Sequence, residues 1–262
     1  MKEEQPELVI DTDVGTDCDD LFALTYAMQA MKLGKVDIKA ITTVQGNTQV
    51  RAKIARKLER IIKSNIPIIS GESCSEEAVR KYWLGMEDKI LSEAEKAEPL
   101  EVYEWPQYNP NTQLACIGPL TNIAMQLERN PSIKNVRNIY VMGSSLTSHN
   151  FVVDLEAKEK VFAQPWNIFQ ITKEDSLKIK FSRDELEALK KSKLGNFLAD
   201  SAAAWLKRSG KDEAAMYDVL VVSAVMNEGY VKFEKRARNL YVSCGVDLKL
   251  KERLLEAIRD GN

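Results

Sequence analysis

Short apolar runs alternate with helical patterns along the first two thirds of the chain. Continuous apolar runs predict buried strands at residues 8–10, 38–44, 67–69, 114–117, 136–142 and 167–171. Apolar residues at helical spacing predict helices over residues 21–31 and 47–64 and a further helix that ends near residue 128. This alternation predicts an α/β fold with a mostly parallel central sheet, a Rossmann-like core and helices on both faces.

The remaining stretches follow less regular patterns. Helices are expected over residues 183–192, 194–208, 213–227 and 249–259, and strands within residues 231–246. Residues 71–111 are interrupted by Pro99, Pro106 and Pro110, which favours a helical excursion beside the sheet. No internal repeat or long linker divides the 262 residues, so we expect one domain that spans residues 1–262.

An aspartate-rich loop follows the first predicted strand. Residues 11–20 read DTDVGTDCDD, with five aspartates in ten positions. Ligands of parallel sheets bind beyond the carboxyl ends of the strands, where this loop lies. Two unit charges about 4 Å apart repel by roughly 4 kcal/mol at an effective dielectric constant near 20, and a divalent cation removes that cost. Because Ca²⁺ and Mg²⁺ prefer carboxylate and carbonyl oxygens, the loop predicts a divalent-metal site that binds a small polar ligand.

Two other interpretations of this loop are open. A polar turn that caps the next helix accounts for one or two aspartates, but not for Asp11 and Asp13 at the strand end together with Asp19 and Asp20. Phosphoryl transfer by an aspartate nucleophile, as in the haloacid dehalogenases, also uses Asp-x-Asp after a strand. That pattern wants Thr or Val where Gly15 stands, and the further aspartates would repel a phosphate.

Composition narrows the class of protein. The chain is 44% apolar and 29% charged with a formal net charge of −2, which gives no basis for binding nucleic acid or an acidic membrane. It has no run of about 18 apolar residues, and residues 1–7 lack the apolar core of a secretion signal. The four cysteines are widely separated, which suits a reducing compartment. We expect a cytoplasmic protein with a small-molecule ligand and with no nucleic-acid or membrane partner.

Further blocks of sequence follow the aspartate loop in a fixed order. The full set is VIDTDVGTDCDDLFAL at residues 9–24, ITTVQGN at 41–47, IGPLTNIA at 117–124, YVMG at 140–143, NFVVDLEA at 150–157 and YDVL at 217–220. Together these blocks resemble the inosine–uridine-preferring nucleoside hydrolase family over residues 8 to about 225. The resemblance implies an N-ribohydrolase with a nucleoside hydrolase-like α/β fold and, since such proteins are commonly dimers or tetramers, a homo-oligomer.

The resemblance also implies roles for individual residues. A Ca²⁺ ion would have four ligands, which are the carboxylates of Asp13, Asp20 and Asp218 and the backbone carbonyl of Ile117. The ribose would be held by Asp19, Asn47 and Asn150. Asp13 would also deprotonate the water that attacks the anomeric carbon. This agrees with the independent interpretation of the loop, in which a hard cation acidifies water beside an aspartate base.

Two departures from the family pattern concern the rest of the substrate. The loop before Asn150 is shorter than usual, and Ser148 stands where a glutamate for the ribose 5′-hydroxyl is expected. Tyr217 replaces a histidine near the nucleobase. A histidine that protonates the leaving group would have to be His149, because the chain has one histidine. Both His149 and Tyr217 are therefore candidate substrate contacts.

Two functions follow from the sequence. The first is calcium-dependent hydrolysis of the N-glycosidic bond of a ribonucleoside or related ribosyl compound, with Trp83 as a candidate contact to the base. The alternative is a non-catalytic, metal-dependent binder of a ribosylated ligand. The attacking side of the site is complete, which favours the hydrolase. The aromatic residues Trp166 and Trp205 are expected in the core.

Overall fold

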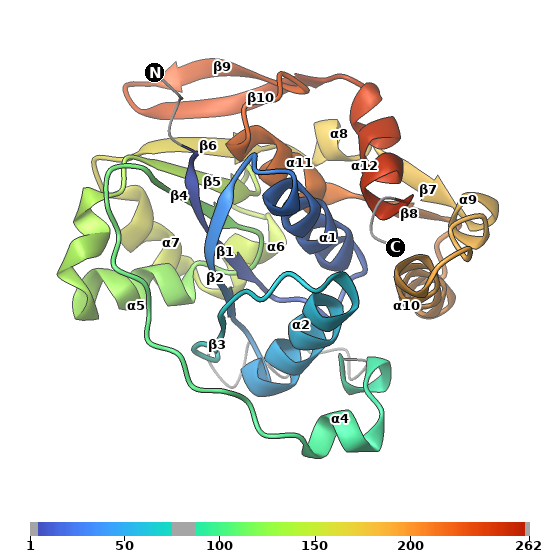
Figure 1. Cartoon of the computed structure of the whole chain (residues 1–262). Coiled ribbons are helices and arrows are strands. Elements are labelled where there is room, and N and C mark those ends of the chain that lie inside the picture. The colour runs from blue at the N-terminus through green and yellow to red at the C-terminus, as the bar shows by residue number, and fades with distance from the viewer. Residues whose placement is uncertain (1–4, 75–86, 260–262) are drawn as a thin grey trace.

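A computed structural model describes residues 5–74 and 87–259. In these residues a central sheet of eight strands runs in the order β3-β2-β1-β4-β5-β6-β10-β9 (Figure 1). The strands are β1 (Glu7–Thr12), β2 (Asp37–Thr43), β3 (Ile68–Ser70), β4 (Thr112–Cys116), β5 (Asn138–Met142), β6 (Asn167–Ile171), β9 (Val231–Ala237) and β10 (Leu240–Val246). Neighbouring strands are parallel except β9, which pairs antiparallel with β10 at one edge. The predicted mostly parallel sheet is confirmed.

The middle of the sheet is apolar on both faces. Leu8, Val9 and Ile10 of β1 are at most 1% exposed. Ile10 is in register with Ile41 of β2 and with Ala115 of β4, so β1 has a neighbour on each side as well as a layer on each face. A strand in this position is formed by a continuous apolar run rather than by an alternating one.

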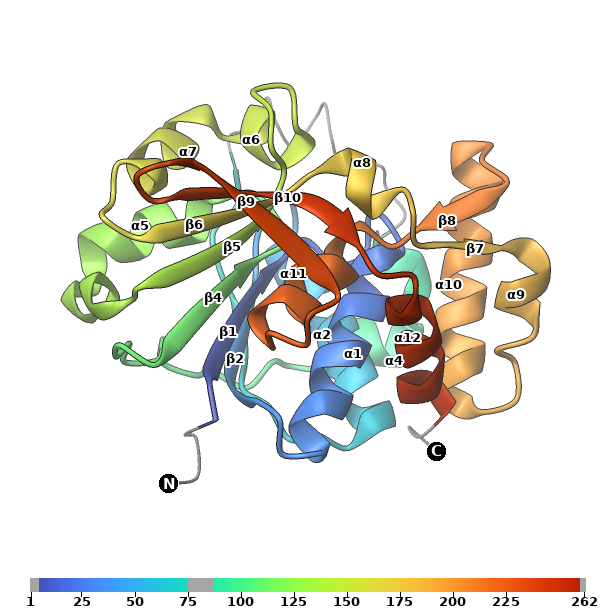
Figure 2. The ribbon, with the colours of Figure 1, turned by 90° about the horizontal axis from the view of Figure 1, so that it is seen from above.

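Helices cover the sheet on both faces, as predicted (Figure 2). One face carries α1 (Asp19–Lys32), α2 (Thr48–Ile62), α11 (Tyr217–Val225) and α12 (Lys249–Arg259), and α10 (Lys193–Ser209) packs against this layer. The other face carries α5 (Thr121–Arg129) and α7 (Leu155–Phe162). Short helices fill the connections, namely η2 (Pro131–Asn135), α6 (His149–Val153), α8 (Lys173–Ser176) and α9 (Arg183–Glu187). Within residues 5–74 and 87–259, no helix is both long and apolar enough to cross a membrane.

One predicted helix is wrong in its first part. Residues 213–227 do not form a single helix, because Glu213–Ala215 form β8, which pairs antiparallel with β7 (Lys180–Ser182). Pairing and burial outweigh the helix propensity of the two alanines. As a result α11 starts at Tyr217 and places Asp218 in its first turn. The helix predicted over residues 183–192 is also shorter than expected and ends at Glu187.

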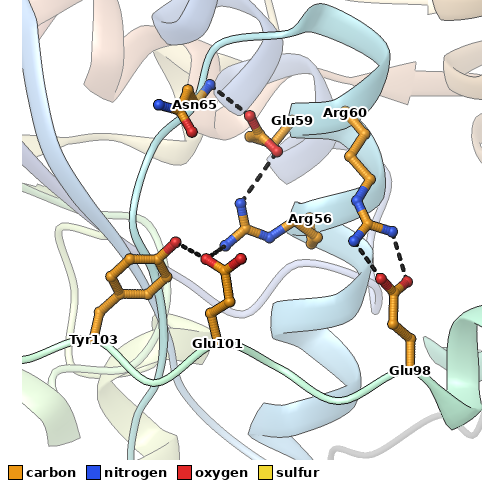
Figure 3. A network of polar contacts seen from close by, with 7 residues as sticks. All are labelled: Arg56, Glu59, Arg60, Asn65, Glu98, Glu101 and Tyr103. Atoms are coloured by element: carbon orange, nitrogen blue, oxygen red, sulfur yellow. Dashed lines mark hydrogen bonds and ion pairs between the residues drawn. The ribbon is translucent and has the colours of Figure 1, made fainter.

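The described part of the predicted excursion crosses the outside of α2. Its helices are η1 (Glu87–Ile90) and α4 (Glu93–Ala97), and the chain from residue 98 to β4 is not helical, so the predicted helical character holds only in part. Ion pairs attach this stretch to α2: Glu98 contacts Arg60, and Glu101 lies 3.9 Å from Arg56 (Figure 3). Each pair has an exposed glutamate, and pairs at the surface contribute about 0–1 kcal/mol each, so they guide the path of the chain more than they stabilise it.

Candidate functional site

Loops from several strands meet at one edge of the sheet. Because β1, β2, β4 and β5 are parallel, the residues that follow them lie at the same, carboxyl edge. The loop after β1 leads into α1, which begins at Asp19. Helix α11 packs alongside α1, and its first turn carries Asp218 (Figure 1). Residues about 200 positions apart in the sequence therefore share one site, and Asp19 and Asp218 are 199 positions apart.

Three carboxylates form the centre of this site. One oxygen each of Asp19, Asp20 and Asp218 lies within 4.8 Å of the other two, and these side chains are buried. In the part of the chain that the structure describes, this is the one group of three or more acidic, histidine or cysteine side chains spaced to hold a metal ion. All three stand in the first turn of a helix, where the helix dipole favours negative charge.

The electrostatics of this cluster fit a cation. Burial, followed by the charges of neighbouring aspartates, raises the pKa of Asp218 and of Asp20 well above the usual range. Burial and the charge of Asp17 raise the pKa of Asp19 to about 7. Asp19 is the neighbouring charge with the largest effect on the pKa of Asp218, and two like charges this close favour a proton on one of them. Buried carboxylates that must take up protons in order to coexist fit a divalent cation with hard oxygen ligands.

Asp13 borders the three central carboxylates. It is 7% exposed, and its charge contributes to the raised pKa values of Asp20 and Asp218. Burial raises the pKa of Asp13 itself, while the charges of Arg51 and His149 act in the opposite direction. Of the predicted carboxylate ligands, the group within 4.8 Å contains Asp20 and Asp218, and it contains Asp19 in place of Asp13. Asp13 lies near enough for its charge to act on both of them.

Ile117 and Asn150 are also brought to this edge of the sheet. The Asn150 side-chain amide donates a hydrogen bond of 2.8 Å to the backbone carbonyl of Ile117. Asn150 is buried in the short helix α6, whereas the preceding His149 is exposed. Asn47 lies in the loop after β2 and is exposed, and its side-chain oxygen accepts a hydrogen bond of 3.1 Å from the Val50 amide. In this structure Asn47 therefore acts as the N-cap of α2.

Of the two aromatic candidates, Tyr217 and Trp83, the structure describes Tyr217. Tyr217 is half-buried beside the cluster, and burial together with the charges of Asp19 and Asp17 raises the pKa of its phenol. Trp83 lies outside the described residues. Trp166 and Trp205 are buried, as the sequence predicts.

Asp11 and Asp17 have roles that the sequence did not separate from those of the other aspartates. The carboxyl of Asp11 accepts hydrogen bonds of 2.6 Å from Thr42 and 2.7 Å from Asn122. Burial raises the pKa of Asp11 to about 7. Asp17 accepts a hydrogen bond of 2.7 Å from the indole of Trp205 on α10. Both residues anchor the loop to the rest of the fold.

A further residue that the sequence analysis missed is Arg51 of α2. It is fully buried and donates hydrogen bonds into the aspartate loop, to the backbone carbonyl of Val14 at 3.0 Å and to the Thr16 hydroxyl at 2.8 Å. One feature of the sequence could have identified it. Arg51 stands at helical spacing from Ile54, Ala55 and Leu58, which puts its charge on the apolar side of the predicted helix.

The mostly parallel sheet and the acidic cluster at its carboxyl edge define an α/β protein with a site suited to a divalent metal. The chain belongs to the family described as inosine-uridine preferring nucleoside hydrolase, whose model matches residues 8–254. The family predicted from the sequence blocks is therefore confirmed.

Individual relatives agree with this assignment. The non-specific ribonucleoside hydrolase RihC of Klebsiella pneumoniae is 29% identical over 178 residues, which cover 59% of this chain and 57% of that protein. The match therefore spans little more than half the length of that relative. The probable uridine nucleosidase 1 of Oryza sativa subsp. japonica is 24% identical over 261 residues, which cover 87% of this chain and 79% of that protein.

Solved structures show the same fold. The purine-preferring ribonucleoside hydrolase from Gardnerella vaginalis superposes with a TM-score of 0.79 at 17% identity, covering 97% of this chain and 98% of that one. The type III effector protein XopQ, solved in complex with adenosine diphosphate ribose, gives a TM-score of 0.77 at 14% identity, covering 99% and 95%. At such identities the likeness concerns the fold alone.

Proposed function

We propose that the protein is a calcium-dependent hydrolase that cleaves the N-glycosidic bond of a ribonucleoside or related ribosyl compound to free base and ribose. The observation that carries the proposal is the cluster of buried carboxylates at two helix N-termini, in a chain of the nucleoside hydrolase family. The proposed calcium ligands are Asp13, Asp20, Asp218 and the carbonyl of Ile117. A set of carboxylate and carbonyl oxygens suits Ca²⁺ better than it suits a transition metal.

In the proposed reaction Asp13 takes a proton from the attacking water as the water oxygen bonds to the anomeric carbon. The bond from that carbon to the base nitrogen breaks, and its electron pair leaves with the base. Calcium, when bound, supplies Lewis acidity toward water and a fixed charge that orients ribose hydroxyls. Asp19, Asn47 and Asn150 are proposed to hold the ribose, and the nearby carboxylates stabilise the positive charge that develops on the sugar.

The leaving base needs a proton, and two residues are proposed to provide or orient it. The raised pKa of Tyr217 keeps its phenol protonated at neutral pH, so it can donate a hydrogen bond but is a weak acid. His149 is exposed, and its charge acts on Asp13, which supports a place beside the bound sugar. Trp83 stays a proposed contact to the base.

A specific observation favours a second function. Among structures with this fold, XopQ was solved in complex with adenosine diphosphate ribose. In addition, Ser148, which stands where the family pattern has a glutamate, accepts hydrogen bonds of 3.1 Å from the backbone amides of Ser144 and Ser145, which closes its own loop. The alternative is a metal-dependent binder of a ribosylated ligand that does not cleave it.

A panel of purine, pyrimidine and modified nucleosides separates the two functions. Calcium-loaded protein is incubated with each compound, and reducing sugar and free base are both measured. We expect release of base and ribose in equal amounts from at least one nucleoside. No release from any compound by protein that still binds calcium would contradict the hydrolase. A rise in melting temperature with adenosine diphosphate ribose would then support the binder.

The proposal also covers the domain, the binding partner, the location and the assembly of the enzyme. We propose that one domain over residues 1–262 carries the activity, that its partner is a small nucleoside-like molecule rather than nucleic acid or membrane, and that it works in the cytoplasm as a homo-oligomer. Size-exclusion chromatography with light scattering checks the assembly, for which a dimer or tetramer is expected.

A further inference from the structure

Arg51 is a buried charge that the proposed reaction does not use. Its side chain is 0% exposed, on the fourth residue of α2. Arginine is almost never fully buried unless it is paired, because leaving water is unfavourable unless its N–H groups find acceptors. The acceptors that Arg51 finds therefore indicate what its burial accomplishes.

The guanidinium of Arg51 gathers acceptors from two loops at the carboxyl edge of the sheet. Its Nε donates to the backbone carbonyl of Gln45 at 2.7 Å. Its Nη1 donates to the carbonyls of Asp13 and Val14, the latter at 3.0 Å. Its Nη2 donates to the Thr16 hydroxyl at 2.8 Å. A rigid planar fork that binds three residues from 13 to 16 fixes the backbone of that segment more tightly than a single contact could.

Other contacts make the same segment sensitive to small shifts. On the side of β4, a Cβ added at Gly118 would lie 2.9 Å from the Asp13 amide nitrogen, so the two backbones are already in close approach. Gln45, whose carbonyl Arg51 binds, has φ of 70°, a conformation that L residues rarely adopt. Asp13 is therefore held between Gly118 and Arg51, and the Arg51 contact also supports a strained neighbouring loop.

We infer that Arg51 is a positioning residue for Asp13, and that its guanidinium sets the backbone of residues 13–16 so that the Asp13 carboxylate faces the acidic cluster. The consequence for turnover rests on the proposed hydrolase function. The consequence for metal binding rests on the geometry of the loop alone.

Helix α2 offers a matched control for this inference. Arg56 lies five residues further along the helix, and its side chain is 15% exposed. Its guanidinium contacts Glu59 at 3.2 Å and Glu101 at 3.9 Å (Figure 3). The Glu59 contact lies within α2, and the Glu101 contact joins α2 to the outer stretch of chain rather than to the aspartate loop. Arg56→Ala therefore removes a largely buried arginine from α2 but leaves the contacts to the aspartate loop in place.

The test compares Arg51→Ala, Arg51→Lys and Arg56→Ala with the wild type. Terbium luminescence measures metal affinity, and steady-state kinetics on a cleaved nucleoside gives kcat and KM. For Arg51→Ala we expect terbium binding to weaken about tenfold or more, as for other residues that orient metal ligands. We expect kcat to fall about 100-fold with a smaller change in KM, because the reacting group is misplaced rather than removed. Added methylguanidinium should restore part of both quantities, and it should leave Arg56→Ala unchanged.

Arg51→Lys tests the fork itself. Lysine keeps the charge but lacks the planar fork, so terbium affinity and kcat should fall between those of the wild type and Arg51→Ala. Wild-type terbium affinity in Arg51→Ala, or in Arg51→Lys if the alanine variant does not fold, would overturn the inference. Equal losses in Arg51→Ala and Arg56→Ala without rescue by methylguanidinium would also overturn it. If the wild type cleaves no nucleoside, the proposed function fails while terbium binding still decides the role of Arg51.

Discussion

Replacing Asp218 by asparagine should stabilise the metal-free protein and should reduce the further stabilisation that calcium gives. The carboxylate of Asp218 lies within 4.8 Å of those of Asp19 and Asp20. At an effective dielectric constant of about 20, each such pair repels by about 3 kcal/mol when both groups are charged. Asparagine keeps the shape and removes the charge. Because the raised pKa values of Asp19 and Asp20 leave these groups partly protonated, we count one of the two pairs. The metal-free variant should therefore gain about 3 kcal/mol, which corresponds to a rise of about 6–12 °C in Tm for a chain of this size.

The gain should depend on pH with a definite sign. Burial, then Asp19 and Asp20, raise the pKa of Asp218 in the folded protein, so the native state holds a proton that the unfolded chain releases. Stability from that proton is full below the unfolded pKa of about 3.9, and it is lost as pH rises toward the folded pKa. The advantage of Asp218→Asn should therefore be small near about pH 4.5 and large near about pH 8. With calcium present the variant lacks a charged ligand, and calcium should raise its Tm less than that of the wild type.

Melting curves of both proteins, in chelator and in calcium at each pH, measure these effects. Asp175→Asn is the control, because Asp175 is a buried carboxylate that pairs with Lys178 at 2.7 Å, outside the cluster. That variant should lose stability with and without calcium. A chelated Asp218→Asn protein that melts at or below the wild-type temperature near about pH 8 would refute the argument, since the cluster would then carry no repulsion. An unreduced calcium shift would remove Asp218 from the metal site.

Three further substitutions test other parts of the site. Gly118→Ala places a Cβ 2.9 Å from the amide nitrogen of Asp13, so terbium affinity should fall at least tenfold while the protein stays folded. Wild-type terbium affinity in this variant would mean that the loop can move aside. If His149 protonates the leaving base, His149→Ala should slow cleavage of inosine by about 100-fold or more. The same variant should cleave p-nitrophenyl riboside at the wild-type rate, because that leaving group needs no proton. Equal slowing with both substrates would exclude that role. Asn122→Ala removes the hydrogen bond of 2.7 Å to Asp11 and should lower the free energy of unfolding in urea by about 1–3 kcal/mol; no change would mean that Asp11 is held by other contacts.

Most of the sheet could be predicted from the sequence because burial on both faces leaves a direct pattern. Residues 8–10 and 114–117 are apolar without interruption, and the structure places them side by side at the centre of the sheet. Residues 213–215 could not be predicted in the same way. Their sequence, Glu-Ala-Ala, favours a helix, and the contact that makes them a strand comes from Lys180–Ser182, more than 30 positions earlier.

The chemistry of the site could be predicted better than its supports. Repulsion among clustered aspartates is visible in the sequence, so Asp13 and Asp20 were natural candidates. The hydrogen bond from Trp205 to Asp17 joins residues 188 positions apart, and no local pattern indicates it. The helical spacing of Arg51 places it on the apolar side of its helix, but the acceptors that it binds in the loops after β1 and β2 appear only in the tertiary structure. Periodicity can show that such a residue is buried, but its partners depend on packing between distant segments.

In the proposed function, the buried carboxylates hold a calcium ion that enables cleavage of a ribosyl bond. The most direct measurement is release of reducing sugar from the preferred nucleoside by chelator-stripped protein, before and after calcium is restored, with Asp13→Ala in parallel. We predict negligible release from the stripped protein, full recovery with calcium, and no recovery for Asp13→Ala. Undiminished release by protein freed of calcium, or wild-type release by Asp13→Ala, would contradict the account.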